Sequence, residues 1–177
     1  SLHTIDAPGA KMRQSGYLAR DDEANPPLKL AEHLKNAMQG TIGTVFVWYE
    51  AFEKTRNTEM AQMFPEYEEF FNEVNAKTVD LMKIFADRLY IHPDFKGRSS
   101  IKRVGPVLVP DLKYSDLGIA EGLTASISWF RAATWKTLDD SEREAIFNDL
   151  EVYCNLDTLV MVEIYNLLRT IVPQIPS

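Results

Sequence analysis

The segment TIGTVFVWYEAFEKTRN, residues 41–57, changes character in its middle and decides the predicted fold. Its first half is a nearly continuous run of β-branched and aromatic residues up to Trp48, which is typical of a buried strand in a parallel or mixed sheet. After Trp48 the pattern becomes that of a helix, which Pro65 ends. We therefore expect a strand that leads directly into a helix.

The rest of the chain predicts short strands before this segment and mostly helices after it. Residues 1–6 and 15–19 are candidates for two strands, and 28–39 for a helix that Gly40 stops. The later helices are expected at 67–89, at 101–106, at 123–135, and from 141 to 171. The centre of the first of these is less regular near 77–80 and can hold a break. Ser141 and Glu144 have the capping-box spacing that opens the last of these. The predicted class is α/β, with a small mixed sheet and helices.

Composition narrows the classes of protein that this chain fits. Its 177 residues, net charge of −7 and single cysteine suggest one domain in a reducing, cytoplasmic environment. No apolar run approaches the ~18 residues of a membrane helix. The negative charge argues against a protein that coats nucleic acid with a basic face. It does not exclude an enzyme that acts on nucleic acid, because carboxylates that collect divalent metal are themselves acidic.

Three places carry residues suited to chemistry, and the first is the junction in residues 41–57. Ligands bind beyond the carboxyl ends of strands in such sheets, and Glu53 lies a few residues past that end. Glu50 is nearer to the strand but falls on a different side of the helix. The alternative is that both are acids of the first helical turn, favoured there by the helix dipole.

The second place is Tyr153 and Asp157, which share one helix face at i and i+4, with Asp149 one turn further back. An acid at the edge of an apolar stripe costs free energy unless it is paired, solvated or bound to metal. A carboxylate can hold a hard divalent ion, and a phenol one turn away can bind a water on that ion. The alternative is that Asp157 caps or pairs locally, for instance with Arg169.

The third place is the basic segment DFKGRSSIKR, residues 94–103. Arg98 and Lys102 flank a predicted helix start, where cations and backbone N–H groups can hold a phosphate. The alternative is a solvated basic loop.

Together these pieces resemble the DEDD superfamily of 3′–5′ exonucleases, the DnaQ-like branch of the ribonuclease-H-like fold, and most closely a bacterial family that carries only a domain-of-unknown-function label. The matching stretches, in order, are SLHTID, VFVWYEAFEKTR, TVDLMKIF, YIHPDFKGRSSIKRV, PDLKYSDLGIAEG and LEVYCNLDTLVMV. The last is the most specific, because Tyr-x-x-x-Asp, here Tyr153 and Asp157, is the third exonuclease motif in its tyrosine form. The second motif, usually Asn-x-x-Phe-Asp, stands here as Tyr49, Phe52 and Glu53.

The resemblance implies a two-metal phosphodiesterase that acts on DNA or RNA with Mg²⁺ or Mn²⁺. Glu53 and Asp157 would be metal ligands, and Tyr153 would orient the attacking water. Phe52 would shape the floor of the site, where it would contact nucleic acid together with Arg98 and Lys102. Asp80, in VDLM, would lie nearby in a supporting role and not as a ligand.

The sequence departs from the superfamily at its first motif, Asp-x-Glu, which would lie on a strand before residue 1. Asp21–Glu23 has this spacing but lies in a predicted loop. The expectation is therefore a single exonuclease-like domain over residues 1–177 that lacks its first strand and is inactive or impaired by itself. An exposed sheet edge would then be able to pair with a second copy of the chain.

Two other interpretations stay open. The nuclease fold can be retained without its chemistry, as a module that binds nucleic acid or protein, which the changes at Tyr49 and Glu53 favour slightly. Alternatively, the acids are helix caps and surface charges of a purely structural helical domain.

Overall fold

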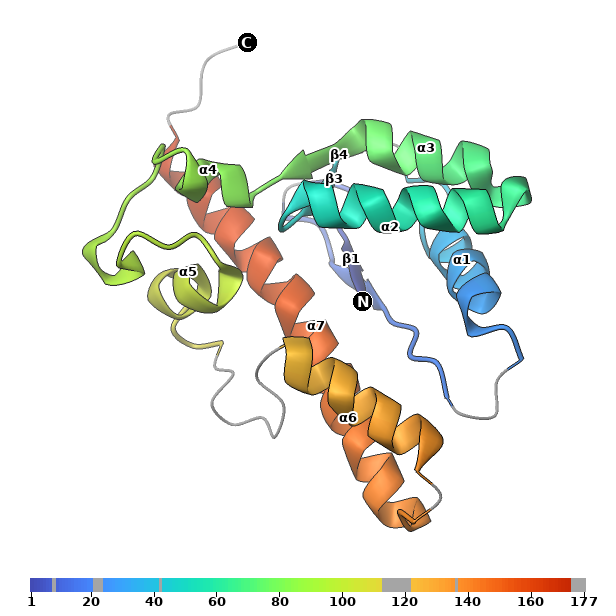
Figure 1. Cartoon of the computed structure of the whole chain (residues 1–177). Coiled ribbons are helices and arrows are strands. Elements are labelled where there is room, and N and C mark those ends of the chain that lie inside the picture. Colours follow the sequence, from blue (N-terminus) through green and yellow to red (C-terminus); the bar gives the residue numbers. More distant parts are fainter. Residues whose placement is uncertain (8, 21–23, 42, 113–121, 136, 173–177) are drawn as a thin grey trace. The chain divides into compact units, whose positions relative to one another are not determined.

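The computed structural model describes residues 1–7, 9–20, 24–41, 43–112, 122–135 and 137–172. The protein is a mixed α/β chain, mostly helical, and in this described part it holds two small sheets (Figure 1). Its contacts divide it into two compact units. Unit 1 comprises Ser1–Gln39 and Lys113–Thr158, and unit 2 comprises Gly40–Leu112 and Leu159–Ser177. The single domain stays a prediction, because one domain can contain two such units.

Unit 1 begins with an antiparallel hairpin of β1 (Leu2–Thr4) and β2 (Arg13–Ser15), in which Leu2 pairs with Ser15. The turn between them contains Gly9 at a φ of 80°, a conformation that glycine adopts without steric cost. Arg13 closes the hairpin with two hydrogen bonds to the Asp6 carboxylate, at 2.7 and 2.8 Å. The second strand was predicted at residues 15–19. The structure has it earlier, because β2 ends at Ser15 and residues 16–19 are not in a strand.

The helices of unit 1 are α1 (Pro26–Ala37), α6 (Gly122–Thr134) and the part of α7 (Asp140–Ile171) that ends at Thr158. α7 does have a capping box at its start, but the predicted residues are wrong. The Asp139 carboxylate accepts the Glu142 N–H at 2.8 Å, and the Glu142 carboxylate accepts the Asp139 N–H at 3.2 Å. Asp139 and Glu142 therefore form the capping box that was predicted for Ser141 and Glu144. The helix begins two residues earlier than its apolar stripe suggests.

Arg20 ties the segment that follows β2 to the first part of α7. The Arg20 guanidinium lies 4.4 Å from the centre of the Phe147 ring, which is 1% exposed. The same group donates hydrogen bonds to Glu144 at 2.8 Å and to Glu151 at 3.1 Å. The Trp129 indole of α6 donates to the Ala19 carbonyl at 2.9 Å. The segment that follows β2 is therefore fixed to both helices.

Unit 2 is built around a parallel pair of strands, β3 (Val45–Val47) and β4 (Thr78–Asp80), with Val47 opposite Asp80. The parallel strand predicted from residues 41–50 is confirmed, although its residues are half-buried. The helix expected over 67–89 is broken at the irregular centre that the sequence indicated near 77–80. It is divided into α3 (Glu68–Lys77), strand β4 and α4 (Met82–Ala86), and the strand itself was not predicted.

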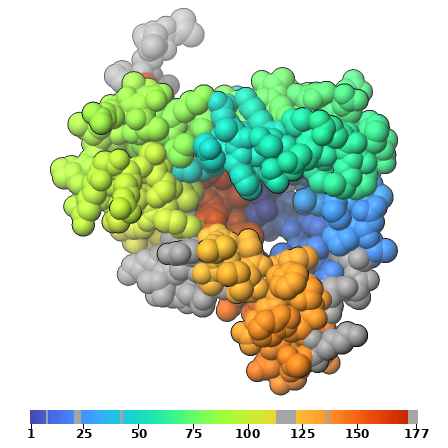
Figure 2. Space-filling model, viewed as in Figure 1, coloured from blue at the N-terminus to red at the C-terminus, as the bar shows by residue number. Residues whose placement is uncertain are grey.

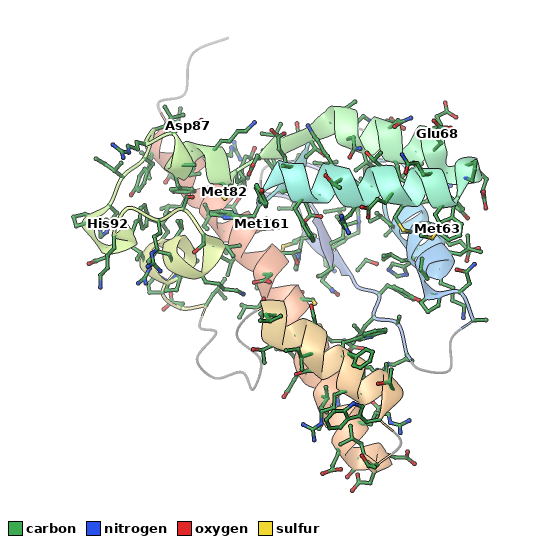
Figure 3. All side chains as sticks on the ribbon, viewed as in Figure 1. Met63, Glu68, Met82, Asp87, His92 and Met161 are labelled. Carbon is green, nitrogen blue, oxygen red and sulfur yellow. The ribbon has the colours of Figure 1, made fainter. Side chains whose placement is uncertain are left out.

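In the sequence, β3 and β4 are separated by two helices that pack on each other, α2 (Glu50–Met63) and α3. The short helix η1 (Pro65–Tyr67) joins these two helices. Figure 2 shows α2 and α3 side by side along one continuous surface. Met63, at the end of α2, and Glu68, at the start of α3, mark the turn in Figure 3. Asn57 of α2 donates a hydrogen bond to Asn75 of α3 at 2.8 Å, which fixes the alignment of the two helices.

The core of unit 2 is largely aromatic where α4, η2 (Pro93–Phe95) and β3 meet. Phe85, 6% exposed, stacks on Trp48 with ring centres 5.5 Å apart and meets the edge of Phe95 at 5.7 Å. α5 (Ile101–Leu108) packs on α7 through Gly105. A Cβ atom there would lie 2.9 Å from a methyl of Val160, so only glycine permits this approach.

Candidate functional site

The junction between β3 and α2 is organised by a buried carboxylate. Asp80, 6% exposed at the end of β4, accepts hydrogen bonds from the backbone N–H groups of Tyr49 and Glu50 at 3.0 Å each. It also accepts the N–H of Met82 at 2.9 Å. Tyr49, the residue before α2, has a φ of 79°, and its own side chain makes no capping bond. A carboxylate from the neighbouring strand therefore satisfies the first amides of α2.

The two glutamates in the first turn of α2 have different surroundings. Glu50 forms ion pairs with Lys54 at 3.0 Å and with Lys83, and these hydrogen bonds lower the pKa of its carboxyl. Its position fits the alternative of a dipole-favoured surface acid. Glu53 is half-buried, and within the described part of the chain no cation forms a salt bridge with it. Burial raises the pKa of Glu53 above the ordinary glutamate range.

Replacing Glu53 by glutamine is expected to raise the melting temperature of the metal-free protein at pH 7. Because the pKa of Glu53 is higher in the folded state than in the unfolded state, ionising this carboxyl costs more in the folded state. The free energy of unfolding therefore falls as pH rises through the unfolded pKa, and it stays lower above the folded pKa. Below that range the carboxyl is neutral in both states, and the advantage of the variant disappears. Thermal unfolding at pH 3 and pH 7 in a chelator measures the difference.

The matched control is Glu69→Gln, which changes an exposed glutamate in the first turn of α3. We expect no gain in melting temperature from this control at either pH. A Glu53→Gln variant that melts lower than the wild type at pH 7 would contradict the conclusion that burial makes the ionised Glu53 side chain destabilising.

Tyr153 and Asp157 lie one turn apart on α7, within unit 1, as the spacing predicted. Tyr153 is 6% exposed, and its hydroxyl lies 3.9 Å from where a Cβ of Gly122 would stand, at the start of α6. Asp157 is half-buried. Its neighbour Thr158 is hydrogen-bonded to Ser1 and to the His3 ring, at 2.9 Å each, so β1 lies beside this turn of α7. Arg169, the suggested partner of Asp157, lies over the ring of Tyr165.

The basic segment of residues 94–103 belongs to unit 2 and turns sharply before α5. Lys96 and Gly97 have φ values of 51° and 71°. Arg98 is exposed and Lys102 is half-buried at the start of α5. The Trp48 indole donates a hydrogen bond to the Ser99 carbonyl at 3.1 Å, which fixes this loop beside the end of β3. The segment is therefore anchored near the junction that carries Phe52 and Glu53.

Phe52 is 54% exposed, and the Arg56 guanidinium lies 5.5 Å from its ring centre. Tyr49 is 52% exposed, three residues earlier. The junction thus presents two aromatic rings to solvent next to a basic loop.

Unit 2 holds Glu53, Phe52, Arg98 and Lys102, and unit 1 holds Tyr153 and Asp157. The meeting of Glu53 and Asp157 in one pocket stays a prediction. Among the described residues, no group of three or more His, Cys, Asp or Glu side chains is arranged to hold a metal ion. Asp21–Glu23 and most of the matching stretch PDLKYSDLGIAEG lie outside the described residues.

Two contacts that position these residues were missed by sequence reasoning. The cap on α2 was not predicted, because its donor and acceptor are 31 residues apart and belong to different elements. A signal was nevertheless present, since Asp80 follows two β-branched residues, Thr78 and Val79, in a stretch assigned to helix. The contact of β1 with Thr158 joins the two ends of unit 1 and has no local signal.

In the parts of the chain that the structure describes, no helix combines the length and apolarity needed to cross a membrane. Searches with this chain found no match among curated proteins and none among solved structures. A family model described as a domain of unknown function, DUF2779, matches residues 1–100 of the 177. This is more than half of the chain, which therefore belongs to the DUF2779 family.

Proposed function

We propose that this chain is a 3′–5′ exonuclease-like nuclease domain of the DEDD superfamily, with a ribonuclease-H-like fold. It would hydrolyse phosphodiester bonds of DNA or RNA with two Mg²⁺ or Mn²⁺ ions. The observation that carries the proposal is the pair Tyr153 and Asp157, one turn apart on α7 with the phenol buried and the acid half-buried. A carboxylate can hold a hard divalent ion, and a phenol one helical turn away can bind a water on that ion.

In this proposal Glu53 and Asp157 bind the metals. The burial of Glu53, which raises the pKa of its carboxyl, supports its role, because a bound cation would reduce the cost of ionising it. Tyr153 would orient the attacking water. Bound metal ions would supply activation of that water and stabilisation of the leaving oxygen.

The experiment that tests this function is metal-dependent release of nucleotides from a labelled single-stranded oligonucleotide. It compares two proteins. One is the chain of residues 1–177, and the other is a fusion protein in which a strand with the first motif, Asp-x-Glu, precedes residue 1. We expect negligible hydrolysis by the chain alone, because Glu53 and Asp157 supply half of the metal ligands that the superfamily uses. We expect hydrolysis by the joined protein in Mn²⁺ and none in a chelator. Absence of hydrolysis from the joined protein would reject the proposal.

Arg98 and Lys102 are the proposed contacts to the nucleic-acid backbone. Replacing both by alanine should weaken binding of single-stranded nucleic acid and flatten its salt dependence, because fewer counterions are released. Two lost phosphate contacts correspond to a slope of log Kobs against log salt that is shallower by about 1.4. Fluorescence anisotropy at a series of salt concentrations measures both quantities.

Lys11 and Arg131, two exposed cations of unit 1, provide the matched control pair. Their replacement by alanine removes the same formal charge and should leave the slope nearly unchanged. Equal slopes for the two double variants would mean that net charge, and not this loop, governs binding.

A second candidate function is a binding module without catalysis. The exposed rings of Tyr49 and Phe52 favour it, since aromatic side chains stack on unpaired bases and Tyr49 replaces the asparagine of the usual motif. Binding that needs no metal, in a joined protein that hydrolyses nothing, would decide for this candidate.

A further inference from the structure

We propose that the outer face of α6 is the contact surface of a dimer formed by two copies of this chain. This face consists of large apolar side chains in contact with solvent: Leu123 is 74% exposed, Ile127 is 59% exposed and Phe130 is 58% exposed. Together with Thr134 they stand at positions i, i+4, i+7 and i+11, so they form one stripe along the helix, which we name the α6 stripe. Trp135, 51% exposed, directly follows the helix and adds an aromatic ring at its end.

The two sides of α6 reverse the distribution that is usual in a surface helix. The side opposite the α6 stripe carries small residues, of which Ala132 is 1% exposed and Ala125 and Ser128 are half-buried. The start of α6 lies close to α7, because a Cβ atom on Gly122 would stand 3.9 Å from the Tyr153 hydroxyl. A surface helix normally turns its larger apolar residues toward the core and its polar residues toward water. The larger apolar residues of α6 face water instead, and a contiguous exposed apolar surface of this kind marks an interaction site.

The charge around the α6 stripe indicates which partner it fits. The segment Gly122–Phe130 contains no charged residue, although 25% of the chain is charged and its net charge is −7. The exposed residues Asp139, Asp140 and Glu142 follow at the start of α7. A nucleic acid or an anionic membrane would therefore meet acids and no cation along these residues, and a strongly charged protein would find no complementary charge on the stripe. A second copy fits, because acidic chains repel each other except where their surfaces are uncharged.

The spacing within the α6 stripe is complementary to itself. Two copies related by a two-fold axis make each contact twice, since residue i meets j and j meets i. In an antiparallel arrangement of the two helices, Ile127 faces Phe130 of the second copy while Phe130 faces Ile127. In the same register Leu123 faces Thr134, next to Trp135, at both ends of the contact. Each large apolar residue of the stripe is then covered by the other copy.

The area of the face fits a weak dimer. A whole phenylalanine or tryptophan side chain presents about 150–250 Å² to water, and more than half of Phe130 and of Trp135 is exposed. With Leu123 and Ile127 the face offers roughly 400–500 Å², so a dimer would bury about 800–1,000 Å² in total. A specific interface needs about 1,000 Å² or more, and smaller ones are transient. We therefore expect dimers that dissociate at roughly micromolar concentrations.

Sedimentation equilibrium over a range of protein concentrations tests the proposal. The wild type should rise from the monomer mass of 20.2 kDa toward twice this value. Ile127→Glu and Phe130→Arg should each weaken association at least about 30-fold, because each places an unpaired charge at the centre of the contact. Leu89→Glu is the matched control and should associate as the wild type does, since Leu89 is 78% exposed and lies in unit 2, outside α6. Circular dichroism verifies that all three variants fold, as expected for exposed positions.

A mixture of the two α6 variants tests the pairing itself. In a dimer of one Ile127→Glu chain and one Phe130→Arg chain, the introduced carboxylate faces the introduced guanidinium, and the other contact is the native one between Ile127 and Phe130. The mixture should therefore dimerise at concentrations at which each variant alone is monomeric. A mixture that remains monomeric would overturn the proposal. A wild type that is monomeric at every concentration would also overturn it and leave the face to a different protein. So would an Ile127→Glu variant that dimerises as the wild type does, which would place the dimer on another surface, such as the exposed sheet edge.

Discussion

Replacing Asp157 by asparagine is expected to abolish hydrolysis by a protein that joins this chain to an Asp-x-Glu strand. The amide keeps the size of the side chain but loses the negative charge that, in the proposed function, would hold a divalent ion. A catalytic metal contributes several kcal/mol to stabilisation of the transition state, and about 4 kcal/mol corresponds to roughly 10³-fold in rate. The measurement is the initial rate of nucleotide release at saturating Mn²⁺, in wild type and variant.

Asp149→Asn is the matched control for this experiment. Asp149 lies on the same helix, two turns before Asp157, and is exposed. We expect its replacement to change the rate less than about threefold, since surface charges away from the site contribute little. An Asp157→Asn variant that keeps more than a tenth of the wild-type rate would remove Asp157 from the metal site.

Replacing Phe71 by alanine is expected to give the largest loss of stability. Phe71 of α3 is 2% exposed and packs with its ring centre 5.2 Å from that of Phe70. Removing a buried phenylalanine side chain costs roughly 3–5 kcal/mol, from lost burial and from the cavity left behind. Urea unfolding followed by circular dichroism gives the free energy of unfolding.

Phe52→Ala provides the comparison in the neighbouring helix α2, because the Phe52 side chain is 54% exposed. Its replacement should change the free energy of unfolding by less than about 1 kcal/mol, as surface substitutions do. The same variant should weaken binding of single-stranded nucleic acid if the ring stacks on a base. If Phe71→Ala lowers the free energy of unfolding by less than about 1 kcal/mol, the burial of Phe71 does not contribute substantially to the stability of the protein.

Elements with a long, regular pattern were predictable, and those with few residues were not. β3 and α2 were expected from the abrupt change at Trp48, and α2 ends two residues before Pro65, as proline requires. The irregular pattern near 77–80 indicated a break, but β4 itself was missed because its three residues are too short for an alternating pattern. Only pairing with β3, which no local rule detects, makes Thr78–Asp80 a strand.

The candidate site shows the same limit of local reasoning. The spacing of Tyr153 and Asp157 depends on helix geometry alone, and α7 preserves it. Asp80 was expected to support the site, but its bonds to Tyr49 and Glu50 depend on the register of two strands distant in sequence. The start of α7 was misjudged by two residues, because both Asp139 and Ser141 precede a glutamate at the same spacing.

The parallel pairing of β3 and β4 has a consequence for the order of folding. It joins positions 45 and 78, which are 33 residues apart, whereas the contacts between α2 and α3 close a much shorter loop. Local contacts form early and distant ones late, because closing a longer loop costs more chain entropy. We therefore expect the helical hairpin to assemble first and to bring the two strand segments together. The Asp80 carboxylate would then reach the amides of α2 only in this final step, so the junction that carries Glu53 would be completed late.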